Sequence, residues 1–443
     1  MKNENGESVK HTTPYRPSFS ESSVRWLYSL LLLLLAPLAF IILMIRGAWR
    51  VKAPGRRPLE RLGLVASPEP DGYLFHCVSV GEVVAASALI KQIMQQEPET
   101  PITITTTTAT GSARVNAIFG NSVHHFYLPY DLHIIMACML RRVKPKAVVI
   151  TEVELWPNMI HACWRRCIPA FVINGRLTDR SARRYNKVSL LFSPMLKKLS
   201  HVCAQGERDY RNYLKLGMHT NRLTLTNNIK FDQAASISAG ADFMHLASDS
   251  RPVLVGGSTH EPEEQVLLDA LATIHRKYPN TLLILVPRHP ERFEQVARLL
   301  ETYSFNWCRS AETTTLPAGC QVVLLNEMGK LNEAYQVADF AFVGGSIAQR
   351  GGHNALEPAA VAVPVMMGPH TFNNPVICQY LEEHGALTIT PTADEIASCC
   401  EQWLINPESA RQAGASGKAV LQANSGALTA TLACIKLGVR RNK

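Results

Sequence analysis

The stretch ADFAFVGGSIAQRGGHNALEPAAVAVPVMMGPHTFNNP, residues 338–375, decides the fold of this chain. Its apolar run Phe340–Val343 predicts a buried strand, which ends at the glycine-rich turn Gly344–Ser346. A second apolar run, Val363–Met367, predicts another strand, and the residues between the two predict a helix. This order of strand, helix and strand is the repeating unit of a parallel α/β sheet.

The helix expected between these strands begins at a second glycine pair, Gly351-Gly352. His353 and Glu357 are four residues apart, so they would share one face of that helix. A glycine turn that leads into a helix N-terminus presents free N–H groups and the positive end of the helix dipole, and both favour an anion. A carboxylate there is placed to accept hydrogen bonds from the two hydroxyls of a ribose. An ordinary turn with a capped helix explains the same glycines without a ligand.

Beyond this stretch, short apolar segments alternate with helical ones in two halves, 50–235 and 250–443. The first half contains seven apolar segments: Tyr73–Val78, Ile102–Thr107, His125–Leu128, Ala147–Thr151, Ala170–Ile173, His201–Ala204 and Leu223–Thr226. The second half contains six: Pro252–Val255, Leu282–Val286, Gln321–Leu325, Phe340–Val343, Val363–Met367 and Ala386–Ile389. The alternation predicts two mostly parallel α/β sheets joined by the polar linker 234–250. In such sheets, ligands bind beyond the carboxyl ends of the strands.

The composition and the motifs limit the partners and ligands that this protein is expected to bind. A net charge of +9 suits a protein that works at an anionic surface or on an acidic substrate. Nucleic acid is not expected as a partner, because the sequence has no zinc spacing and no helix-turn-helix signature. Dinucleotide and Walker A fingerprints are also missing. The eleven cysteines are scattered, as in a reduced cytosolic protein, and offer no metal-ligand spacing.

The N-terminus combines a polar tail, residues 1–25, with an uncharged apolar segment, residues 26–45. About 20 residues of helix span the ~30 Å hydrocarbon core of a bilayer. Basic residues follow: Arg46, Arg50, Lys52, Arg56, Arg57 and Arg61. This pattern predicts a single-pass transmembrane anchor with the rest of the chain on the cytoplasmic side. A cleaved signal peptide and a shallow, non-spanning insertion are the alternatives.

Two strand ends in the first half carry carboxylates. Glu82 follows the turn Ser79–Gly81 and begins a helix, where it serves either as a helix cap or as a rigidly held base. Glu152 and Glu154 follow another strand, and they point the same way if strand geometry persists. Such a pair binds a divalent metal or holds arginines in place. The sequence has no DxD pattern, so we do not expect a metal.

A cluster of cations lies on the helix predicted after the strand at 170–173. Its members are Arg176, Arg180, Arg183, Arg184 and Lys187. They form either a solvated charged face or a surface that grips the phosphates of an anionic glycolipid.

The motifs in both halves resemble those of the bacterial Kdo transferases, which attach 3-deoxy-D-manno-octulosonic acid (Kdo) to the lipid A precursor. The resemblance lies in GGSxxxRGGHNxLEPA and GPHTFN of the opening stretch, in SVGE at 79–82 and in TEVELWPN at 151–158. It implies a GT-B fold of the glycosyltransferase family 30 type, with two Rossmann-like domains facing a cleft and an N-terminal membrane-anchor helix. It also implies inverting transfer of Kdo from CMP-Kdo to lipid IVA, at the cell inner membrane, in lipopolysaccharide core biosynthesis.

The resemblance assigns roles to single residues. It implies that Glu82 is the general base, that Glu152 stabilises the transition state, and that Lys230 in TNNIKFD acts on the transition state or a phosphate. Contacts with CMP-Kdo are implied for Pro287, Arg288, Met328, Gly329, Lys330, Ser346, Gly352, His353, Asn354, Ala355, Leu356 and Glu357. No cofactor and no metal are implied.

Three positions depart from the family pattern. Lys330 stands where the family has glutamate, Ala355 where it has proline, and Asn227-Asn228 where it has Gly-Ser. Two other functions therefore stay open. One is a GT-B enzyme or epimerase that uses a UDP-sugar, and the other is a non-catalytic, membrane-tethered protein that binds nucleotide sugars.

Overall fold

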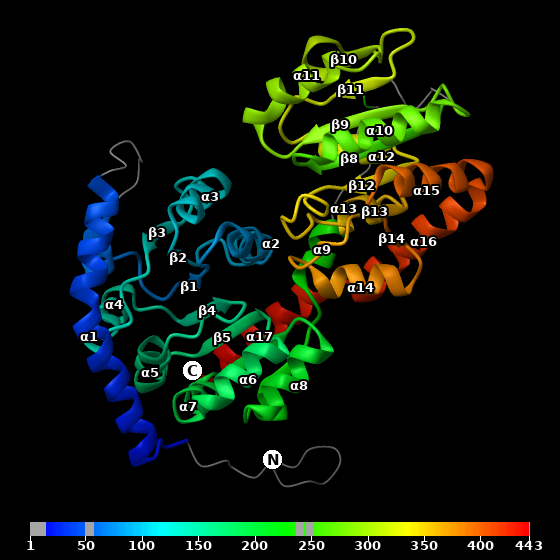
Figure 1. Ribbon diagram of the computed structural model, residues 1–443. Helices are drawn as coiled ribbons and strands as arrows, with labels where there is room; N and C mark the ends of the chain where they lie inside the picture. Colours follow the sequence, from blue (N-terminus) through cyan, green and yellow to red (C-terminus); the bar gives the residue numbers. More distant parts are fainter. Residues whose placement is uncertain (1–14, 49–56, 236–242, 244–250, 443) are drawn as a thin grey trace, which may run out of the picture. The chain divides into compact units, whose positions relative to one another are not determined.

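A computed structural model describes residues 15–48, 57–235, 243 and 251–442. Residues 1–14 of the predicted tail, the basic residues Arg50, Lys52 and Arg56, and most of the predicted linker lie outside the described residues. The chain divides into two compact units, drawn in Figure 1. Unit 1 comprises Met1–Ile229 with Gly426–Lys443, and unit 2 comprises Lys230–Ser425.

Unit 1 contains a seven-stranded sheet in the order β3-β2-β1-β4-β5-β6-β7. All neighbouring strands are parallel. The strands are β1 (Tyr73–His76), β2 (Ile102–Thr106), β3 (His124–Tyr127), β4 (Ala147–Thr151), β5 (Ala170–Gly175), β6 (His201–Ala204) and β7 (Leu223–Leu225). The seven strands predicted for this half are confirmed.

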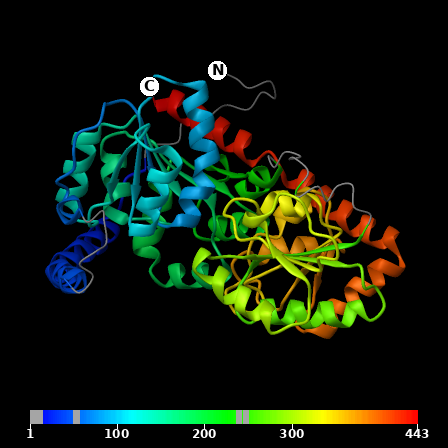
Figure 2. The ribbon, with the colours of Figure 1, turned by 90° about the horizontal axis from the view of Figure 1, so that it is seen from above.

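Alternate residues of these strands belong to two separate hydrophobic cores, one on each face of the sheet. In β1, Leu74 belongs to the core on one face of the sheet, whereas Tyr73 and Phe75 belong to the core on the other. Val148 and Val149 of β4 divide in the same way. Both faces are buried because helices cover both, which explains why the strands read as continuous apolar runs. Figure 2 shows helices on either side of the sheet.

The helices of unit 1 begin where the sequence supplies caps. Thr108 and Thr178 each accept a hydrogen bond from a backbone N–H of the first turn of their helix, and Pro157 opens a third helix. The helices are α1 (Phe19–Ala48), η1 (Pro58–Leu62), α2 (Val80–Gln96), α3 (Ala109–Phe119), α4 (His133–Val143), α5 (Pro157–Arg165), α6 (Asp179–Lys187), α7 (Ser189–Lys198), α8 (Glu207–Lys215), η2 (Thr220–Arg222) and α17 (Ala427–Asn442).

The last helix of the chain belongs to unit 1. Leu432 and Ile435 of α17 are buried in the same core as Phe171 of β5. The predicted second domain was 250–443, whereas the last 18 residues, Gly426–Lys443, belong to the first unit. Apolar side chains of α17 complete this core, whose other members lie before residue 230. Nothing in the local sequence indicates this contact, because α17 is far from those residues along the chain.

Unit 2 repeats the architecture with a second parallel sheet, in the order β10-β11-β9-β8-β12-β13-β14. Its strands are β8 (Val253–Thr259), β9 (Leu282–Pro287), β10 (Trp307–Arg309), β11 (Val322–Leu324), β12 (Phe340–Val343), β13 (Val365–Met367) and β14 (Leu387–Ile389). The six predicted strands are confirmed, and β10 was not predicted. The edge strand β10 has three half-buried residues and no apolar run.

The helices of unit 2 pack on both faces of this sheet. They are α10 (Glu263–His275), η4 (Pro290–Arg292), α11 (Phe293–Glu301), η5 (Ser310–Glu312), α12 (Leu331–Gln336), α13 (Leu356–Ala360), α14 (Pro375–Glu383), α15 (Ala393–Ile405) and α16 (Pro407–Asn424). Helix α9 (Ile229–Ala235) crosses the unit boundary, since Ile229 is buried in a core of unit 1 and Phe231 in a core of unit 2.

Helix α1 lies along α5 and α7 with its polar side inward. Arg25 Nη1 donates to Asn158 Oδ1 at 2.9 Å, and Tyr28 Oη donates to Asp131 Oδ2 at 3.1 Å. The buried Ser29 hydroxyl also lies 3.1 Å from Asn158 Oδ1. Burial raises the pKa of Asp131 to about 7.

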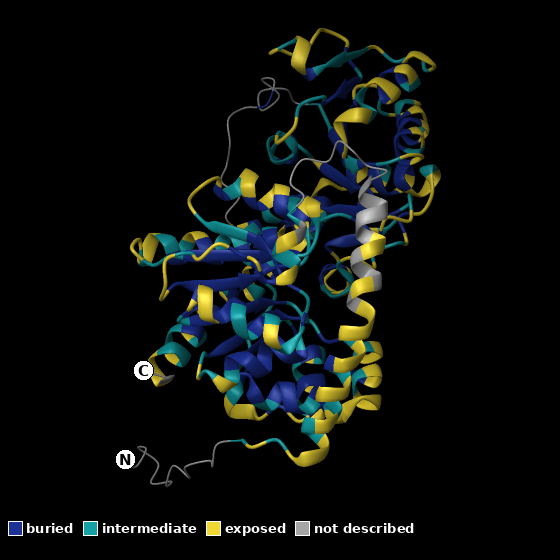
Figure 3. Ribbon diagram, turned by 90° about the vertical axis from the view of Figure 1, so that its left-hand side faces the viewer, coloured by how far each residue is buried: buried dark blue, intermediate teal, exposed yellow. Residues whose placement is uncertain are grey.

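The predicted transmembrane anchor at 26–45 falls within α1. Across the described part of the chain, no helix combines the length and the apolarity that a bilayer span needs. The structure therefore does not support the predicted span. Ser29 within the predicted span and Arg25 just before it are buried and lie within hydrogen-bond distance of Asn158 of α5. Figure 3 shows α1 with much of its length exposed.

Each sheet has one position where the strand order reverses direction. In unit 1 this position lies between β1 and β4, and in unit 2 it lies between β8 and β12. Loops leave such a pair of strands in opposite directions, which opens a crevice at their carboxyl ends. Chemistry-bearing residues are therefore expected after these four strands.

Candidate functional site

Glu82 lies in the first turn of α2, directly after β1. The Val78 N–H donates to Glu82 Oε2 at 2.8 Å, and the Ser79 hydroxyl donates to Oε1 at 3.0 Å. The residue is only 7% exposed. Burial raises the pKa of Glu82 to about 7, although both hydrogen bonds act to lower it. The carboxyl group is thus poised to exchange a proton near neutral pH.

Two further carboxylates lie beside Glu82. Because β1 and β4 are neighbours in the sheet, Glu152 and Glu154 are brought to the same edge, and their charges also raise the pKa of Glu82. Burial, followed by the charge of Glu152, raises the pKa of Glu154 as well. The structure therefore brings together two predicted catalytic residues, Glu82 and Glu152, at the switch point of unit 1.

The backbone at Glu152 differs from the prediction. Strand β4 ends at Thr151, and Glu152 adopts a left-handed conformation with φ of 61°. Strand geometry therefore does not persist to Glu152, so the condition for expecting Glu152 and Glu154 to point the same way is not met. A non-glycine residue in this region is strained by about 1–2 kcal/mol, and such residues gather at functional sites.

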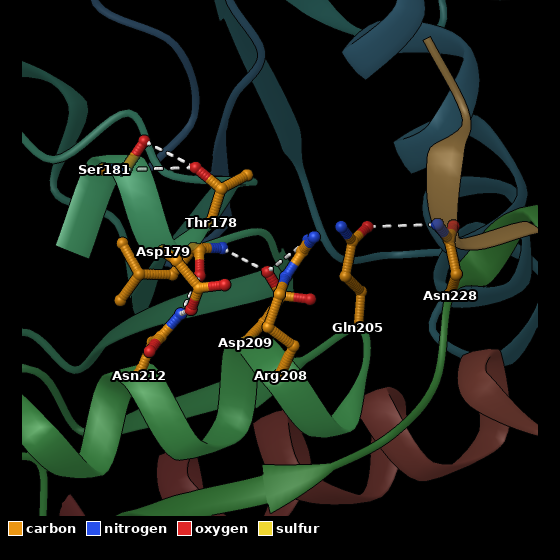
Figure 4. A network of polar contacts seen from close by, with 9 residues as sticks. Thr178, Asp179, Ser181, Gln205, Arg208, Asp209, Asn212 and Asn228 are labelled. Atoms are coloured by element: carbon orange, nitrogen blue, oxygen red, sulfur yellow. Dashed lines mark hydrogen bonds and ion pairs between the residues drawn. The ribbon is translucent and has the colours of Figure 1, made fainter. Parts of the chain in front are cut away.

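The cationic helix α6 is held at its start by a polar network, shown in Figure 4. Thr178 Oγ1 accepts from the Ser181 N–H at 3.2 Å. Asp209 of α8 accepts from the Leu177 N–H at 2.6 Å, and Asn212 donates to the Leu177 carbonyl at 2.9 Å. Four cations of α6 are exposed: Arg180, Arg183, Arg184 and Lys187.

The departure at Asn227-Asn228 preserves the backbone conformation that glycine would adopt. Asn227 has φ of 65°, a left-handed conformation that asparagine tolerates better than most residues. Asn228 donates to Gln205 Oε1 at 3.0 Å (Figure 4). The next residue, Ile229, donates its N–H to Asn174 Oδ1 at 3.2 Å. Asparagine side chains therefore fasten the turn that leads to Lys230.

In unit 2, the glycine turn after β12 already holds an anion, which is a side chain of the protein. Glu263 is fully buried, and its carboxylate accepts from the backbone N–H groups of Gly345, Ser346, Ile347 and Ala348 at 2.8–3.2 Å. The N–H groups expected to face a ligand at this turn are thus occupied. Nothing in the local sequence links Glu263 to this loop, because the two lie over 80 residues apart along the chain.

Ser346 lies inside this turn. Its hydroxyl donates to the Val343 carbonyl at 2.7 Å and accepts from the Gly368 N–H at 2.8 Å. The residue is completely buried. Its hydroxyl therefore joins the loop after β12 to the end of β13.

The helix after the second glycine pair is shorter than predicted. Helix α13 begins at Leu356, so His353 and Glu357 do not share a helix face, and that expectation is wrong. Gly351 and Gly352 have φ of 87° and 71°. A Cβ on Gly351 would lie only 2.5 Å from the Phe372 ring. The two glycines therefore form a left-handed loop instead of the first helical turn.

Glu357 is nevertheless placed as a hydrogen-bond acceptor. Asn354 Nδ2 donates to Glu357 Oε1 at 3.3 Å. Burial raises the pKa of Glu357, and Arg288 counteracts this effect. The charge of Arg288 also acts on His353, so three of the predicted donor residues are electrostatically coupled. Ala355 and Leu356 are fully buried between them.

The remaining predicted donor residues follow β9 and β11. Pro287 ends β9, and the exposed Arg288 is fixed by its N–H, which donates to the Thr259 carbonyl at 3.0 Å. Met328 is 60% exposed, and Gly329 has φ of 90°. Lys330 pairs with Glu333 at 2.9 Å, and that pair raises the pKa of Lys330.

Lys230 is fixed within unit 2. Its Nζ donates to Asn374 Oδ1 at 2.7 Å. Asn374 directly follows the GPHTFN motif, so the predicted catalytic lysine is held next to that motif.

The fold resembles that of solved two-domain α/β structures. The solved structure of MurG from Acinetobacter baumannii resembles this chain with a TM-score of 0.54, at 13% identity, over 83% of this chain and 100% of MurG. This likeness concerns the fold alone. Two parallel α/β units, each with one switch point, place the chain in the class of two-domain α/β folds.

Sequence relatives give the family. A family model described as 3-deoxy-D-manno-octulosonic-acid transferase (kdotransferase) matches residues 56–233. The 3-deoxy-D-manno-octulosonic acid transferase of Haemophilus influenzae is 40% identical over 94% of this chain and 99% of that protein. The enzyme of the same name from Bordetella pertussis is 31% identical over 92% and 98%. The chain belongs to the 3-deoxy-D-manno-octulosonic acid transferase family.

Proposed function

We propose that this protein is an inverting glycosyltransferase that moves Kdo from CMP-Kdo to the lipid A precursor in lipopolysaccharide biosynthesis. Family membership supports the reaction. The observation that carries the mechanism is the buried carboxyl group of Glu82, whose pKa of about 7 suits a general base. We assign the chain to the GT-B class, in which unit 2 binds the donor and unit 1 carries the base.

In this mechanism Glu82 removes the proton from an acceptor hydroxyl as its oxygen attacks the anomeric carbon of Kdo. The bond from that carbon to the phosphate oxygen breaks, and CMP leaves with the electron pair. Arg288 and Lys230 stabilise the negative charge that grows on the phosphate. Glu357 accepts from the ribose hydroxyls, and Glu152 supports the charge that develops at the reacting sugar.

Transfer from freshly generated CMP-Kdo to tetra-acylated lipid A precursor tests the proposal. We expect transfer by the wild-type protein and a loss of about 10²–10⁴-fold in the Glu82→Ala variant. Glu207→Gln is the matched control, because Glu207 also lies in the first turn of a helix of unit 1 but is exposed. Wild-type protein that transfers a sugar from a UDP donor and not from CMP-Kdo would contradict the assignment.

We also propose that α1 lies on the inner membrane that carries the acceptor, with both units on the cytoplasmic side. The polar side chains of α1 at positions 21, 25, 28 and 29 face the domain. Its opposite side exposes apolar residues at helical spacing. These include Leu27, Leu30, Leu31 and Leu34, which are 53–69% exposed. A helix with this arrangement lies in the interface of a bilayer.

Sedimentation with vesicles of anionic phospholipid tests the membrane proposal. We expect the wild-type protein to pellet with the vesicles and a variant with the four leucines changed to glutamine to stay in the supernatant. Ile405→Gln serves as the control, because Ile405 is 73% exposed but lies in unit 2. Equal pelleting of all three proteins would refute a membrane role for α1.

A further inference from the structure

A cavity of about 680 Å³ lies in unit 2, at the carboxyl ends of three neighbouring strands. Its lining residues are His260, Glu261, Pro262, His289, Arg292 and Arg350. Histidine 260 follows β8, His289 and Arg292 follow β9, and Arg350 follows β12. None of these six residues is among the predicted donor contacts. The cavity nonetheless adjoins them, because His289 follows Arg288 and because His260 contacts His353.

The lining contains two arginines and one carboxylate. Arg292 is anchored by Glu264, which accepts from its Nη2 at 2.9 Å, but its buried Nε has no hydrogen-bond partner in the described residues. Arg350 is exposed, and no acidic side chain of the described residues lies within ion-pair distance of its guanidinium. The one carboxylate of the lining, Glu261, is 83% exposed at the side chain and lies 3.6 Å from Arg292. Arg292 is therefore paired with Glu264 and Glu261, whereas Arg350 brings to the cavity a guanidinium that no carboxylate of the described residues neutralises.

The neighbouring positive charge affects the pKa values of His260, which lines the cavity, and of His353, which contacts His260. His260 and His353 stack with ring centroids 5.1 Å apart, and their Nε2 atoms are 2.9 Å apart. Burial, together with neighbouring cations and histidines, lowers the pKa of His353 to about 4 and also lowers that of His260. Both rings are thus neutral at neutral pH and share one hydrogen bond. Since each Nε2 is engaged with the other, the pair is arranged to supply hydrogen bonds and not to ligate a metal jointly.

A small anion with two or more acceptor oxygens fits these donors. Arginine guanidiniums bind carboxylates and phosphates through paired N–H groups, and a neutral histidine adds a further N–H donor. In the proposed reaction the donor carries two such groups, the phosphate of CMP and the carboxylate of the sugar acid. Both are attached to the same anomeric carbon of Kdo, so their binding sites must be adjacent. Arg288, on one side of His353, is the predicted phosphate contact.

We propose that Arg350 and Arg292, with His260 and His289, bind the carboxylate of the transferred sugar acid. This inference rests on the proposed Kdo transfer and adds to it a residue that determines donor specificity. A neutral sugar lacks the carboxylate and would leave the Arg350 guanidinium without an acidic partner. The charge-assisted hydrogen bonds that only a carboxylate forms favour a sugar acid over the neutral sugars of other nucleotide donors.

Arg350 is the residue to test, because it is exposed and no described ion pair depends on it, whereas Arg292 also holds Glu264. In Arg350→Gln we expect the KM for CMP-Kdo to rise about 10- to 100-fold, the effect of one lost charge-assisted hydrogen bond. The inhibition constant of CMP, which has the phosphate but no carboxylate, is expected to stay within about two-fold. Arg350→Lys should recover part of the loss. Arg276→Gln, a change at an exposed arginine on the end of α10, is the matched control.

The outcomes separate the two proposals. If Arg350→Gln weakens CMP and CMP-Kdo equally, the cavity binds the phosphate and the carboxylate assignment is overturned. If neither constant changes while wild-type protein transfers Kdo, the subsite is refuted and the function stands. If wild-type protein transfers no Kdo, both proposals fall.

Discussion

Replacing Glu82 with glutamine distinguishes a catalytic base from a helix cap, because the two roles predict opposite changes in stability. In the wild-type protein the pKa of Glu82 rises from 4.5 in the unfolded chain to about 7 in the fold. The folded state therefore binds this proton more tightly than the unfolded state. The contribution of Glu82 to the free energy of unfolding is therefore highest below pH 4.5. This contribution is lost as the pH rises through 7.

The magnitude follows from the difference between the two pKa values. At 1.36 kcal/mol per pH unit, the ionised carboxylate costs the folded state up to about 3 kcal/mol above pH 7. Glutamine does not ionise, and its amide oxygen can still accept from the Val78 N–H. We therefore expect Glu82→Gln to be more stable than wild type at pH 8, by up to about 3 kcal/mol, and similar at pH 4.5.

Activity should change in the opposite direction. Transfer by Glu82→Gln is expected to fall by about 10²–10⁴-fold. In the wild-type protein, kcat/KM should fall about ten-fold per pH unit below pH 7, since only the ionised carboxylate accepts a proton. Removing the negative charge at Glu154 lowers the pKa of Glu82, so Glu154→Gln should shift this acid limb to lower pH.

The assays are urea unfolding at pH 4.5 and 8, and initial transfer rates between pH 5 and 9. A helix cap would behave differently, because its loss costs about 1 kcal/mol at pH 8 and leaves the transfer rate unchanged. That result would refute the reasoning for Glu82. A wild-type rate that does not change between pH 5 and 8 would also refute it.

Substitutions at three further positions test how the site is built. Glu263→Gln should destabilise unit 2 by about 2–4 kcal/mol in urea unfolding. The reason is that an amide cannot accept from all the backbone N–H groups that the buried carboxylate now satisfies. An unchanged unfolding midpoint would contradict this. Asn227→Val should lower the free energy of unfolding by about 1–2 kcal/mol, because φ at this position is 65°. Asn227→Gly should fold and transfer normally. Equal losses of stability in both variants would show that the side chain matters more than the backbone conformation. Lys330→Glu, which restores the family residue, should leave the melting temperature and the CMP affinity unchanged, because the pair with Glu333 is partly open to solvent. A change in CMP affinity above about three-fold would indicate that this side chain contacts the nucleotide.

Most strands could be predicted from the local sequence, because each of these strands is a short apolar run followed by glycine or a polar residue. Thirteen of the fourteen strands matched such runs, and β10 had no run to detect. The carboxylates after β1 and β4 could be singled out because their motifs are local as well. Their common location at one edge of the sheet followed from parallel pairing, which the alternation of strands and helices predicts.

By itself, the sequence determined two parallel α/β units, the turns that carry Glu82 and Glu357, and the family resemblance. Only the tertiary structure decided that Glu263 fills the glycine turn, that α17 completes the core of unit 1, and that α1 turns its polar side inward. It also decided that Arg350, His260 and Arg292 line one cavity. The physical reason is the range of the interactions. Backbone conformation and apolar periodicity act over a few residues and can be read along the chain, whereas these contacts join segments tens to hundreds of residues apart and exist only once the sheets have formed.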